Sequence, residues 1–246
     1  MTNEYQHYLD LFQECLSKTY IHTFEGGSYT YEITKDTDWV TLNIWLEWSN
    51  GIADWHNNLD FPKQAYKDTK MAWKVHRGFL RVWKSIEPYL ADAILQKDIN
   101  RIQIVGYSHG AALAMLCHEY CIFNRPDCIV EGYGFGCPRV LYGKYSEELL
   151  KRWDDFTVIR NYDDIVTHVP PLLFGYRHVG QVVDLTPKGY YHKQEKKFIN
   201  KFIIGHYDTS IIEQLERHRD EFNEDVMQIG LMIKRIEKMR EEKKND

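Results

Sequence analysis

The most informative absence in this sequence is that of a long hydrophobic run. No stretch approaches the roughly 18 apolar residues that a membrane-spanning helix requires, which argues against a transmembrane segment. A surplus of basic residues is also missing, because 31 Lys and Arg stand against 36 Asp and Glu, for a net charge of −5. This balance argues against a nucleic-acid-binding protein. A globular protein remains, and a length of 246 residues predicts a single domain over residues 1–246.

Two further absences concern location. The first residues, MTNEYQHYLDLFQECLSKTY, lack a basic start followed by an apolar stretch, so no signal peptide is expected. The five cysteines are odd in number and mostly stand in apolar segments, which favours reduced, buried thiols. Together these features predict a cytoplasmic protein.

A metal site was considered at Cys117, His118 and Cys121, because the two cysteines lie one helical turn apart. A fourth nearby ligand with suitable spacing is missing, so ordinary packing within a helix is the expected role of these side chains. We expect neither a metal ion nor an organic cofactor.

The apolar pattern alternates between strand and helix periods from residue 101 onward. RIQIV is short and β-branched, as in a strand buried on both faces, and GAALAMLCHEYCIF after it is rich in helix formers. CIVEGYGFG and FTVIRN predict further strands, and two more are expected around the turn KDTD. This alternation predicts an α/β fold with a mostly parallel, doubly wound sheet flanked by helices. Helices are also expected over residues 3–18, 78–96 and 145–153, and a loop over 49–68.

The last part of the sequence predicts a long amphipathic helix over about residues 208–242. Its apolar residues recur at spacings of three and four, and Arg219 interrupts them once. We expect this stripe to pack on the body of the same chain, which favours a monomer, with a dimer through the helix as the alternative. The stripe consists of Ile212, Leu215, Phe222, Val226, Ile229, Ile233 and Ile236.

The stretch GYSHG, residues 106–110, places a serine between two glycines directly after an apolar strand and directly before a helix. A sharp strand-to-helix turn of this kind presents a nucleophilic serine, and the glycines let the two elements approach closely. Ser108 is therefore the candidate nucleophile. The N–H of His109, at the start of the helix, is a candidate donor to an oxyanion.

A serine hydroxyl needs a base to remove its proton and a carboxylate to orient that base. In this architecture the order along the chain is serine, acid, histidine. Asp163 and Asp164 follow the strand FTVIR and are the candidate acids. The histidines that could act as the base stand at 168, 178, 192, 206 and 218, and His206 is favoured because it follows a short apolar run and precedes the tail helix.

Several segments resemble, in order, the blocks of the class 3 lipases, the fungal-lipase-like branch of the α/β-hydrolases. They are KVHRGFLRVWKSI, IVGYSHGAALAML, YGFGCPRV and RNYDDIVTHVPP, and the resemblance covers about residues 28–210. It implies an α/β-hydrolase core over that range and a triad of Ser108, Asp164 and His206. Asp164 rather than Asp163 matches the family pattern, because it directly precedes IVTHVPP.

The resemblance also implies a second oxyanion donor and a lid. In LEWSNGIADWHNNLDF, Ser49 matches the donor position, and the pair Asp54 and Trp55 matches the lid of the family. Ile52, Trp55 and Leu59 stand at spacings of three and four, which would place them on one face of a short helix. The sequence departs from the family at Trp48, where the family has glycine, and at YDTSI after His206, where the family commonly has an aromatic residue.

The expected function is that of a serine carboxylic-ester hydrolase, a lipase that forms an acyl-enzyme. Acyl-lipid esters at a lipid–water interface are the expected substrates. Phospholipase, aryl esterase and acyltransferase remain alternatives on the same scaffold, because fold does not determine substrate. A weakly catalytic scaffold that binds a lipid or partner through the tail helix is an alternative from another class.

Overall fold

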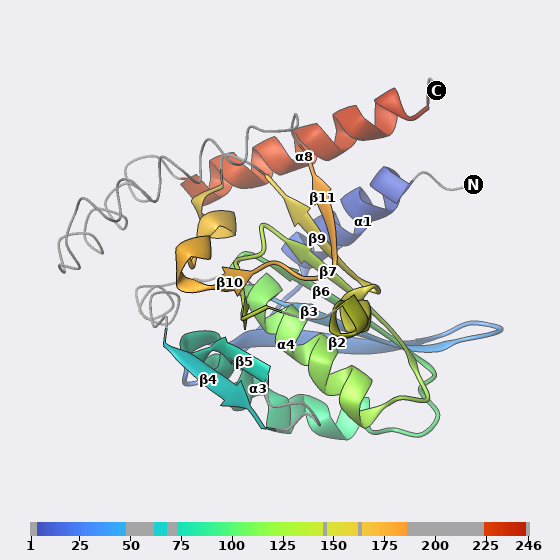
Figure 1. Ribbon diagram of the computed structural model, residues 1–246. Coiled ribbons are helices and arrows are strands. Elements are labelled where there is room, and N and C mark those ends of the chain that lie inside the picture. Colours follow the sequence, from blue (N-terminus) through green and yellow to red (C-terminus); the bar gives the residue numbers. More distant parts are fainter. Residues whose placement is uncertain are drawn as a thin grey trace.

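The computed structural model describes residues 4–47, 62–67, 73–144, 147–161, 164–185 and 224–244 (Figure 1). At its centre lies a seven-stranded sheet in the order β1-β2-β3-β6-β7-β9-β11. The pairs from β3 to β11 are parallel, whereas β1 and β2 are antiparallel at one side. This confirms the α/β fold with a mostly parallel sheet. The strands are β1 (Ile21–His22), β2 (Ser28–Lys35), β3 (Val40–Leu46), β6 (Arg101–Tyr107), β7 (Ile129–Phe135), β9 (Phe156–Arg160) and β11 (Gln181–Asp184).

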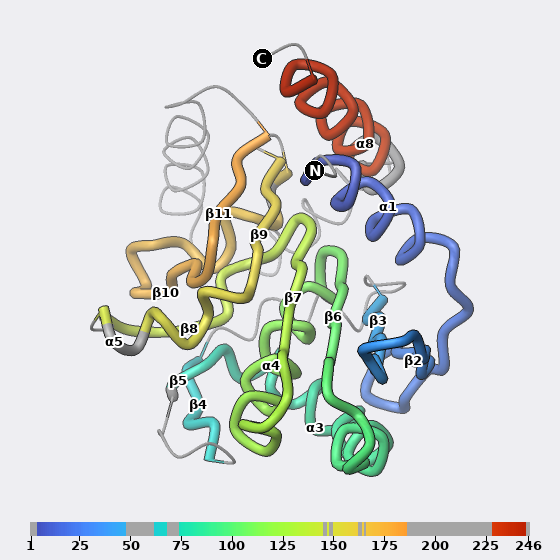
Figure 2. Tube along the Cα trace, turned by 90° about the vertical axis from the view of Figure 1, so that its right-hand side faces the viewer, coloured from blue at the N-terminus to red at the C-terminus, as the bar shows by residue number. Residues whose placement is uncertain are grey.

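Helices cover both faces of this sheet, in agreement with the doubly wound arrangement (Figures 1 and 2). Helices α3 (Arg77–Ile94) and α4 (His109–Asn124) pack against one face, and α1 (Glu4–Ser17) and α8 (Glu224–Glu242) lie at the other. Strand β6 contributes Ile104 to the first core and Val105 to the second, because successive side chains point to opposite faces. The central strands are apolar on both sides for this reason.

A second, smaller sheet was not expected from the sequence. Its four antiparallel strands have the order β10-β8-β5-β4, and β4 lies in the stretch that was predicted to be a loop. That part of the loop prediction is wrong, because a strand of four residues is too short to show a period of its own. Strand β5 leads directly into α3, whose N-cap His76 accepts a hydrogen bond from the Phe79 N–H. The strands are β4 (Lys63–Tyr66), β5 (Trp73–His76), β8 (Leu141–Tyr142) and β10 (Tyr176–Arg177).

The predicted tail helix is described from Glu224 and packs on α1, where Met232 and Ile236 are fully buried. Ile229 and Ile233 of the predicted stripe pack against the same core and are partly buried. In the described structure α8 packs on the body of the same chain, whereas the predicted helix before Glu224 lies outside the described residues. Within the described ranges, every helix is too short or too polar to cross a lipid bilayer.

The predicted helix at 145–153 is a single α-helical turn, α5 (Glu147–Leu150), continued by a 3-10 turn, η1 (Lys151–Trp153). All five cysteines are free thiols, and Cys117 and Cys121 are buried on α4. Burial raises the pKa of the Cys117 thiol and favours its protonated form. Among the described residues no group of His, Cys, Asp or Glu side chains is placed to hold a metal ion.

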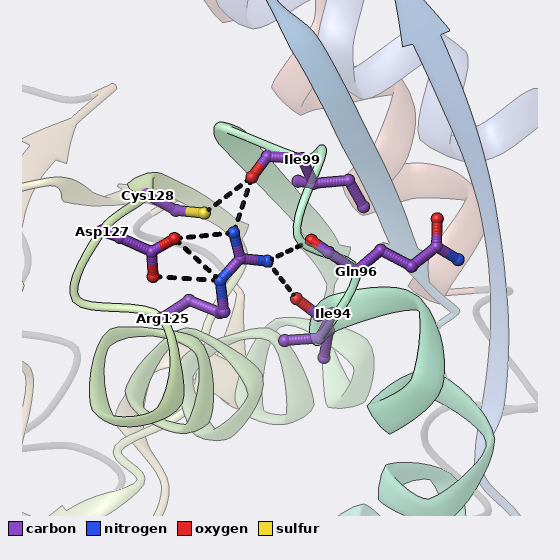
Figure 3. Close-up of polar contacts among 6 residues, drawn as sticks. All are labelled: Ile94, Gln96, Ile99, Arg125, Asp127 and Cys128. Atoms are coloured by element: carbon purple, nitrogen blue, oxygen red, sulfur yellow. Dashed lines mark hydrogen bonds and ion pairs between the residues drawn. The ribbon is translucent and has the colours of Figure 1, made fainter.

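The edge of the central sheet where β6 and β7 begin is held by Arg125 (Figure 3). Its guanidinium donates to the carbonyls of Ile94 and Gln96 at 2.6 and 2.7 Å and to that of Ile99 at 2.6 Å. It also forms an ion pair with Asp127 at 2.9 Å. Arg125 therefore ties the α3–β6 loop to the start of β7.

Candidate active site

Ser108 lies at the turn between β6 and α4, and its backbone is strained. Its φ of 54° and ψ of −119° make it the one non-glycine residue with positive φ in the described part of the chain. Such a conformation costs about 1–3 kcal/mol and persists where the surroundings enforce it. Here the Ser108 N–H donates to the Phe135 carbonyl at 2.8 Å, and its own carbonyl accepts from Ala111 at 3.0 Å. This is the geometry that the GYSHG stretch predicts.

The two glycines of that stretch are required by close contacts. A Cβ at Gly106 would lie 2.2 Å from the Gly110 carbonyl oxygen, and a Cβ at Gly110 would lie 2.1 Å from the carbonyl oxygen of Leu46. Both distances are far below van der Waals contact, and both contacts are to backbone that cannot move aside easily. The glycines therefore let α4 start directly against the ends of β6 and β3.

His109 is the first residue of α4, so its N–H has no carbonyl partner within the helix. The imidazole is buried in a T-shaped contact with the ring of Phe79, with the ring centroids 5.4 Å apart, and neither ring nitrogen has a hydrogen-bond partner in the described structure. Burial lowers the pKa of His109 to about 4, so the ring is neutral near pH 7. The part of His109 suited to stabilising an oxyanion is its backbone N–H.

Asp164 follows β9 and is 3% exposed. Its Oδ1 accepts a hydrogen bond from the Val166 N–H at 2.9 Å, which caps the 3-10 helix η2 (Ile165–His168). The Thr167 hydroxyl donates to the Asp164 carbonyl at 2.9 Å. Asp164 is therefore a buried carboxylate whose backbone and one oxygen are held by its own turn.

Gly136 connects the serine and the aspartate sides of this edge. It follows β7, which lies between β6 and β9 in the sheet, and its N–H donates to the Ile159 carbonyl at 2.9 Å. A Cβ at Gly136 would lie 2.7 Å from Asp164 Oδ2 and 3.3 Å from the ring of Tyr107, the residue before Ser108. Ser108 and Asp164 thus follow the carboxyl ends of strands at the same edge of the sheet, which is where ligands bind in such folds.

Arg139 is a residue of this edge to which the sequence analysis gave no role, although it stands in the quoted block YGFGCPRV. Its buried guanidinium donates to the carbonyls of His168 and Pro170 at 2.7 and 2.9 Å. Its backbone N–H donates to the Val169 carbonyl at 2.8 Å. Arg139 therefore holds the segment that follows Asp164.

Two of the five candidate histidines, His168 and His178, are described. The Arg139 side chain binds the His168 carbonyl, and His178 Nε2 lies 3.0 Å from the Thr167 carbonyl. Burial, together with Arg139 and Arg160, lowers the pKa of His178. These contacts place both histidines in the packing behind Asp164.

The remaining predicted site residues lie outside the described residues. They are His206, the second oxyanion donor Ser49, the lid residues Ile52, Asp54, Trp55 and Leu59, and the neighbouring Trp48 and Asp163.

Two fungal lipases are among the known proteins that are similar to this chain. The lipase of Rhizomucor miehei is 27% identical over 159 residues, which make up 60% of this chain and 43% of that protein. The secreted mono- and diacylglycerol lipase 1 of Fusarium solani is 26% identical over 156 residues, 62% of this chain and 45% of that protein. The chain thus spans less than half the length of these curated relatives.

The predicted cytoplasmic location is contradicted by these relatives. The Fusarium solani protein is named a secreted lipase, which points to an extracellular rather than a cytoplasmic location. The prediction rested on an odd number of cysteines and on the lack of an apolar run near the first residue. Neither feature determines where a chain is delivered, since free thiols buried in a core are protected by packing in any compartment.

The structure is similar to that of a fungal lipase–inhibitor complex, with a TM-score of 0.60 over 74% of this chain and 80% of that chain. The identity is 20%, so this likeness establishes the fold, which is that of the α/β-hydrolases. The sequence profile of the class 3 lipases matches residues 46–174, just over half of the chain. Both Ser108 and Asp164 lie within the matched range. The chain therefore belongs to the class 3 lipase family.

Proposed function

We propose that this protein is a serine carboxylic-ester hydrolase that acts on acyl-lipid esters through Ser108, His206 and Asp164. The observation that carries the proposal is the strained turn at Ser108 with the buried carboxylate of Asp164 at the same edge of the sheet. Strain of this kind is retained at functional sites, because it presents a side chain that a relaxed turn would not. The family supplies the reaction class, and the names of the relatives suggest glycerolipid esters as substrates.

The proposed reaction proceeds by acyl transfer. His206 accepts the hydroxyl proton as Ser108 Oγ attacks the ester carbonyl carbon, which gives a tetrahedral oxyanion. The N–H groups of His109 and Ser49 donate to that oxygen, where the charge develops. The intermediate collapses to an acyl-serine as His206 returns the proton to the departing alcohol. Water, deprotonated by His206, then attacks the acyl-serine, and the second tetrahedral intermediate releases the carboxylic acid as His206 returns the proton to Ser108 Oγ.

Asp164 has the role of orienting His206 in this proposal. A buried carboxylate accepts the imidazole N–H, selects the tautomer and stabilises the imidazolium that forms. The bond from the Val166 N–H holds Oδ1 in its turn, which limits the rotation of the carboxylate that would orient His206. The proposed reaction uses the side chains and backbone of the chain together with the ester and water.

The nucleophile is tested with a short nitrophenyl ester and a fluorophosphonate probe. The wild-type protein should hydrolyse the ester, and the probe should block hydrolysis and label Ser108, as read by peptide mapping. Ser108→Ala should reduce the rate by at least about a thousandfold, because the loss of a triad member costs several orders of magnitude. Labelling of another serine, or undiminished hydrolysis by Ser108→Ala, would contradict the assignment.

We also propose that Ile52, Asp54, Trp55 and Leu59 form a lid whose apolar side covers the acyl site and turns to lipid when open. Closure would exclude water and opening would admit substrate. Rates should then rise abruptly when a sparingly soluble ester passes its solubility limit, and Trp55→Ala should flatten the rise. A smooth hyperbolic dependence through the limit would contradict the lid.

A monomer is the proposed oligomeric state, and the burial of Met232 and Ile236 within the chain supports it. Light scattering at micromolar concentration should give a mass near 29.4 kDa. A dimer that is lost on truncation of the tail helix would contradict this proposal.

A further inference from the structure

We propose that Asn161 and Gln228 are positioning residues for Asp164, and that helix α8 thereby belongs to the support of the catalytic triad. The inference rests on the proposed function. It extends that function to a helix outside residues 46–174, the range that matches the family.

Two hydrogen bonds connect α8 to Asp164. Asn161 follows β9 and is completely buried, and its Nδ2 donates to Gln228 Oε1 at 2.9 Å. The Asn161 carbonyl accepts from the Asp164 N–H at 3.1 Å. Gln228 is 3% exposed, so neither amide exchanges this contact for bulk water.

The polar pair stands beside an apolar core. Gln228 is followed at four-residue spacing by Met232 and Ile236, which are completely buried, so the three lie on the face of α8 that packs on the body. Burying an amide is unfavourable unless it is hydrogen-bonded, and apolar side chains would fill this space without that requirement. The pair therefore favours one placement of α8 along its axis, because a shift along that axis would break the Asn161–Gln228 hydrogen bond.

The far end of α8 is fixed independently of Asp164. The Arg240 guanidinium donates to Gln6 Oε1 on α1 at 2.8 Å, and Lys243 forms an ion pair with Glu4. With that end attached to α1, Gln228 holds the Asn161 side chain from the other end of the helix. Gln228 thus holds the chain before Asp164 through Asn161, and Arg139 holds the chain after Asp164 through the His168 carbonyl.

The expected consequence is a loss of catalytic rate without a loss of substrate binding. When the Asn161 amide loses its partner, the turn shifts and the Asp164 carboxylate moves relative to the imidazole that it orients. Displacement by about 1 Å of a group in the reacting geometry can reduce the rate by up to about 100-fold. Substrate contacts are not altered, so KM should stay unchanged.

The test compares Gln228→Met with Ile236→Ala in the full-length chain. Methionine has nearly the length of glutamine but accepts no comparable hydrogen bond. Ile236→Ala weakens the packing of the same helix without touching the pair. Gln228→Met should reduce kcat on a soluble ester about tenfold at unchanged KM, and slow fluorophosphonate labelling of Ser108 equally. Ile236→Ala should lower the Tm at least as much and keep kcat within twofold.

The double variant Asn161→Leu, Gln228→Met separates positioning from folding. It replaces the polar pair by apolar contact, so it should fold with near wild-type Tm and still show about a tenfold lower kcat. Wild-type kcat in the folded double variant would overturn the inference, as would equal losses of kcat in Gln228→Met and Ile236→Ala. If the wild-type protein itself is not labelled at Ser108, it is the proposed function that fails.

Discussion

The two edges of the central sheet each contain a buried arginine, and they differ in what the arginine supports. Where β6 and β7 begin, Arg125 binds the carbonyls of Ile94, Gln96 and Ile99 (Figure 3). Where the same strands end, Arg139 binds the carbonyls of His168 and Pro170. Both side chains use the several donors of a guanidinium to hold backbone carbonyls at helix ends and in the loops beside them.

The difference lies in the residues beside each arginine. Arg125 is paired with the largely exposed carboxylate of Asp127, and the neighbouring loops have ordinary backbone conformations. At the other edge Ser108 has positive φ, Asp164 is a buried carboxylate and His109 is a buried imidazole without hydrogen bonds in the described structure. One edge thus consists of relaxed contacts, whereas the other retains strained and desolvated groups. Such groups lower stability and are retained where they serve function.

The largest difference between the two edges is expected on substitution of their aspartates, Asp164 and Asp127. Asp164→Asn should reduce kcat/KM about 10³- to 10⁴-fold, because an amide cannot stabilise the imidazolium or select its tautomer in the same way. The fold should persist, since the remaining oxygen can still accept from the Val166 N–H. Asp127→Asn is the matched control at the other edge and should leave kcat/KM unchanged. Initial rates on a soluble ester measure both variants, and equal effects would refute the division between the edges.

The next largest effect is expected on substitution of the two arginines, which should differ in their effect on the catalytic rate. Arg125→Met removes the guanidinium that donates to the carbonyls of Ile94, Gln96 and Ile99, which should reduce the free energy of unfolding by about 2–4 kcal/mol. The rate per folded molecule should stay at the wild-type value. Arg139→Met should reduce stability similarly and also reduce kcat by about tenfold or more, because the segment after Asp164 loosens. Urea denaturation measures the stability of each variant. Activity divided by the number of fluorophosphonate-reactive sites measures the rate per folded molecule and distinguishes the two variants.

A smaller effect should reveal the strain at Ser108. Ser108→Gly and Ser108→Ala should both be inactive, but the glycine variant should be more stable than the alanine variant by about 1 kcal/mol. Glycine adopts positive φ without steric conflict, whereas alanine keeps the strain of the native turn. Thermal unfolding of the two variants measures the difference. A glycine variant that is the less stable of the two would show that the turn is not strained.

The smallest effect is expected at Gly230 on α8. A Cβ added there would meet no atom within 4 Å, so alanine fits without any shift of its surroundings. Gly230→Ala should raise the free energy of unfolding by about 0.5–1 kcal/mol through helix propensity and leave kcat unchanged. This variant stiffens α8 without touching Gln228. A change in kcat would mean that the helix affects the site by a route other than the Asn161–Gln228 bond.

The sequence alone was sufficient for five strands of the central sheet, β2, β3, β6, β7 and β9, and for the turn at Ser108, whereas β1 and β11 were not predicted. Strands at RIQIV, CIVEGYGFG and FTVIR, and the helix after GYSHG, are visible because their patterns are local. The turn is also local, since Gly106 and Gly110 are needed within the motif itself. The family resemblance selected Asp164 over Asp163, whereas His206 was favoured by its place between an apolar run and the tail helix and then matched the family as well; these choices remain predictions.

The tertiary structure determined the long-range strand pairings and hydrogen-bond partners, which no local sequence pattern encodes. The small sheet pairs β5 with β8 across the chain, and strands of two to four residues are too short to show a period. The partners of Arg125 and Arg139 are carbonyls, which every residue possesses, so the sequence does not specify them. Asn161 meets Gln228 across 67 positions because β9 and α8 are brought together by packing. Local sequence thus determined the central strands and helices and the turn at Ser108, whereas the supports of the site arise from groups that meet only when the sheet and its helices are assembled.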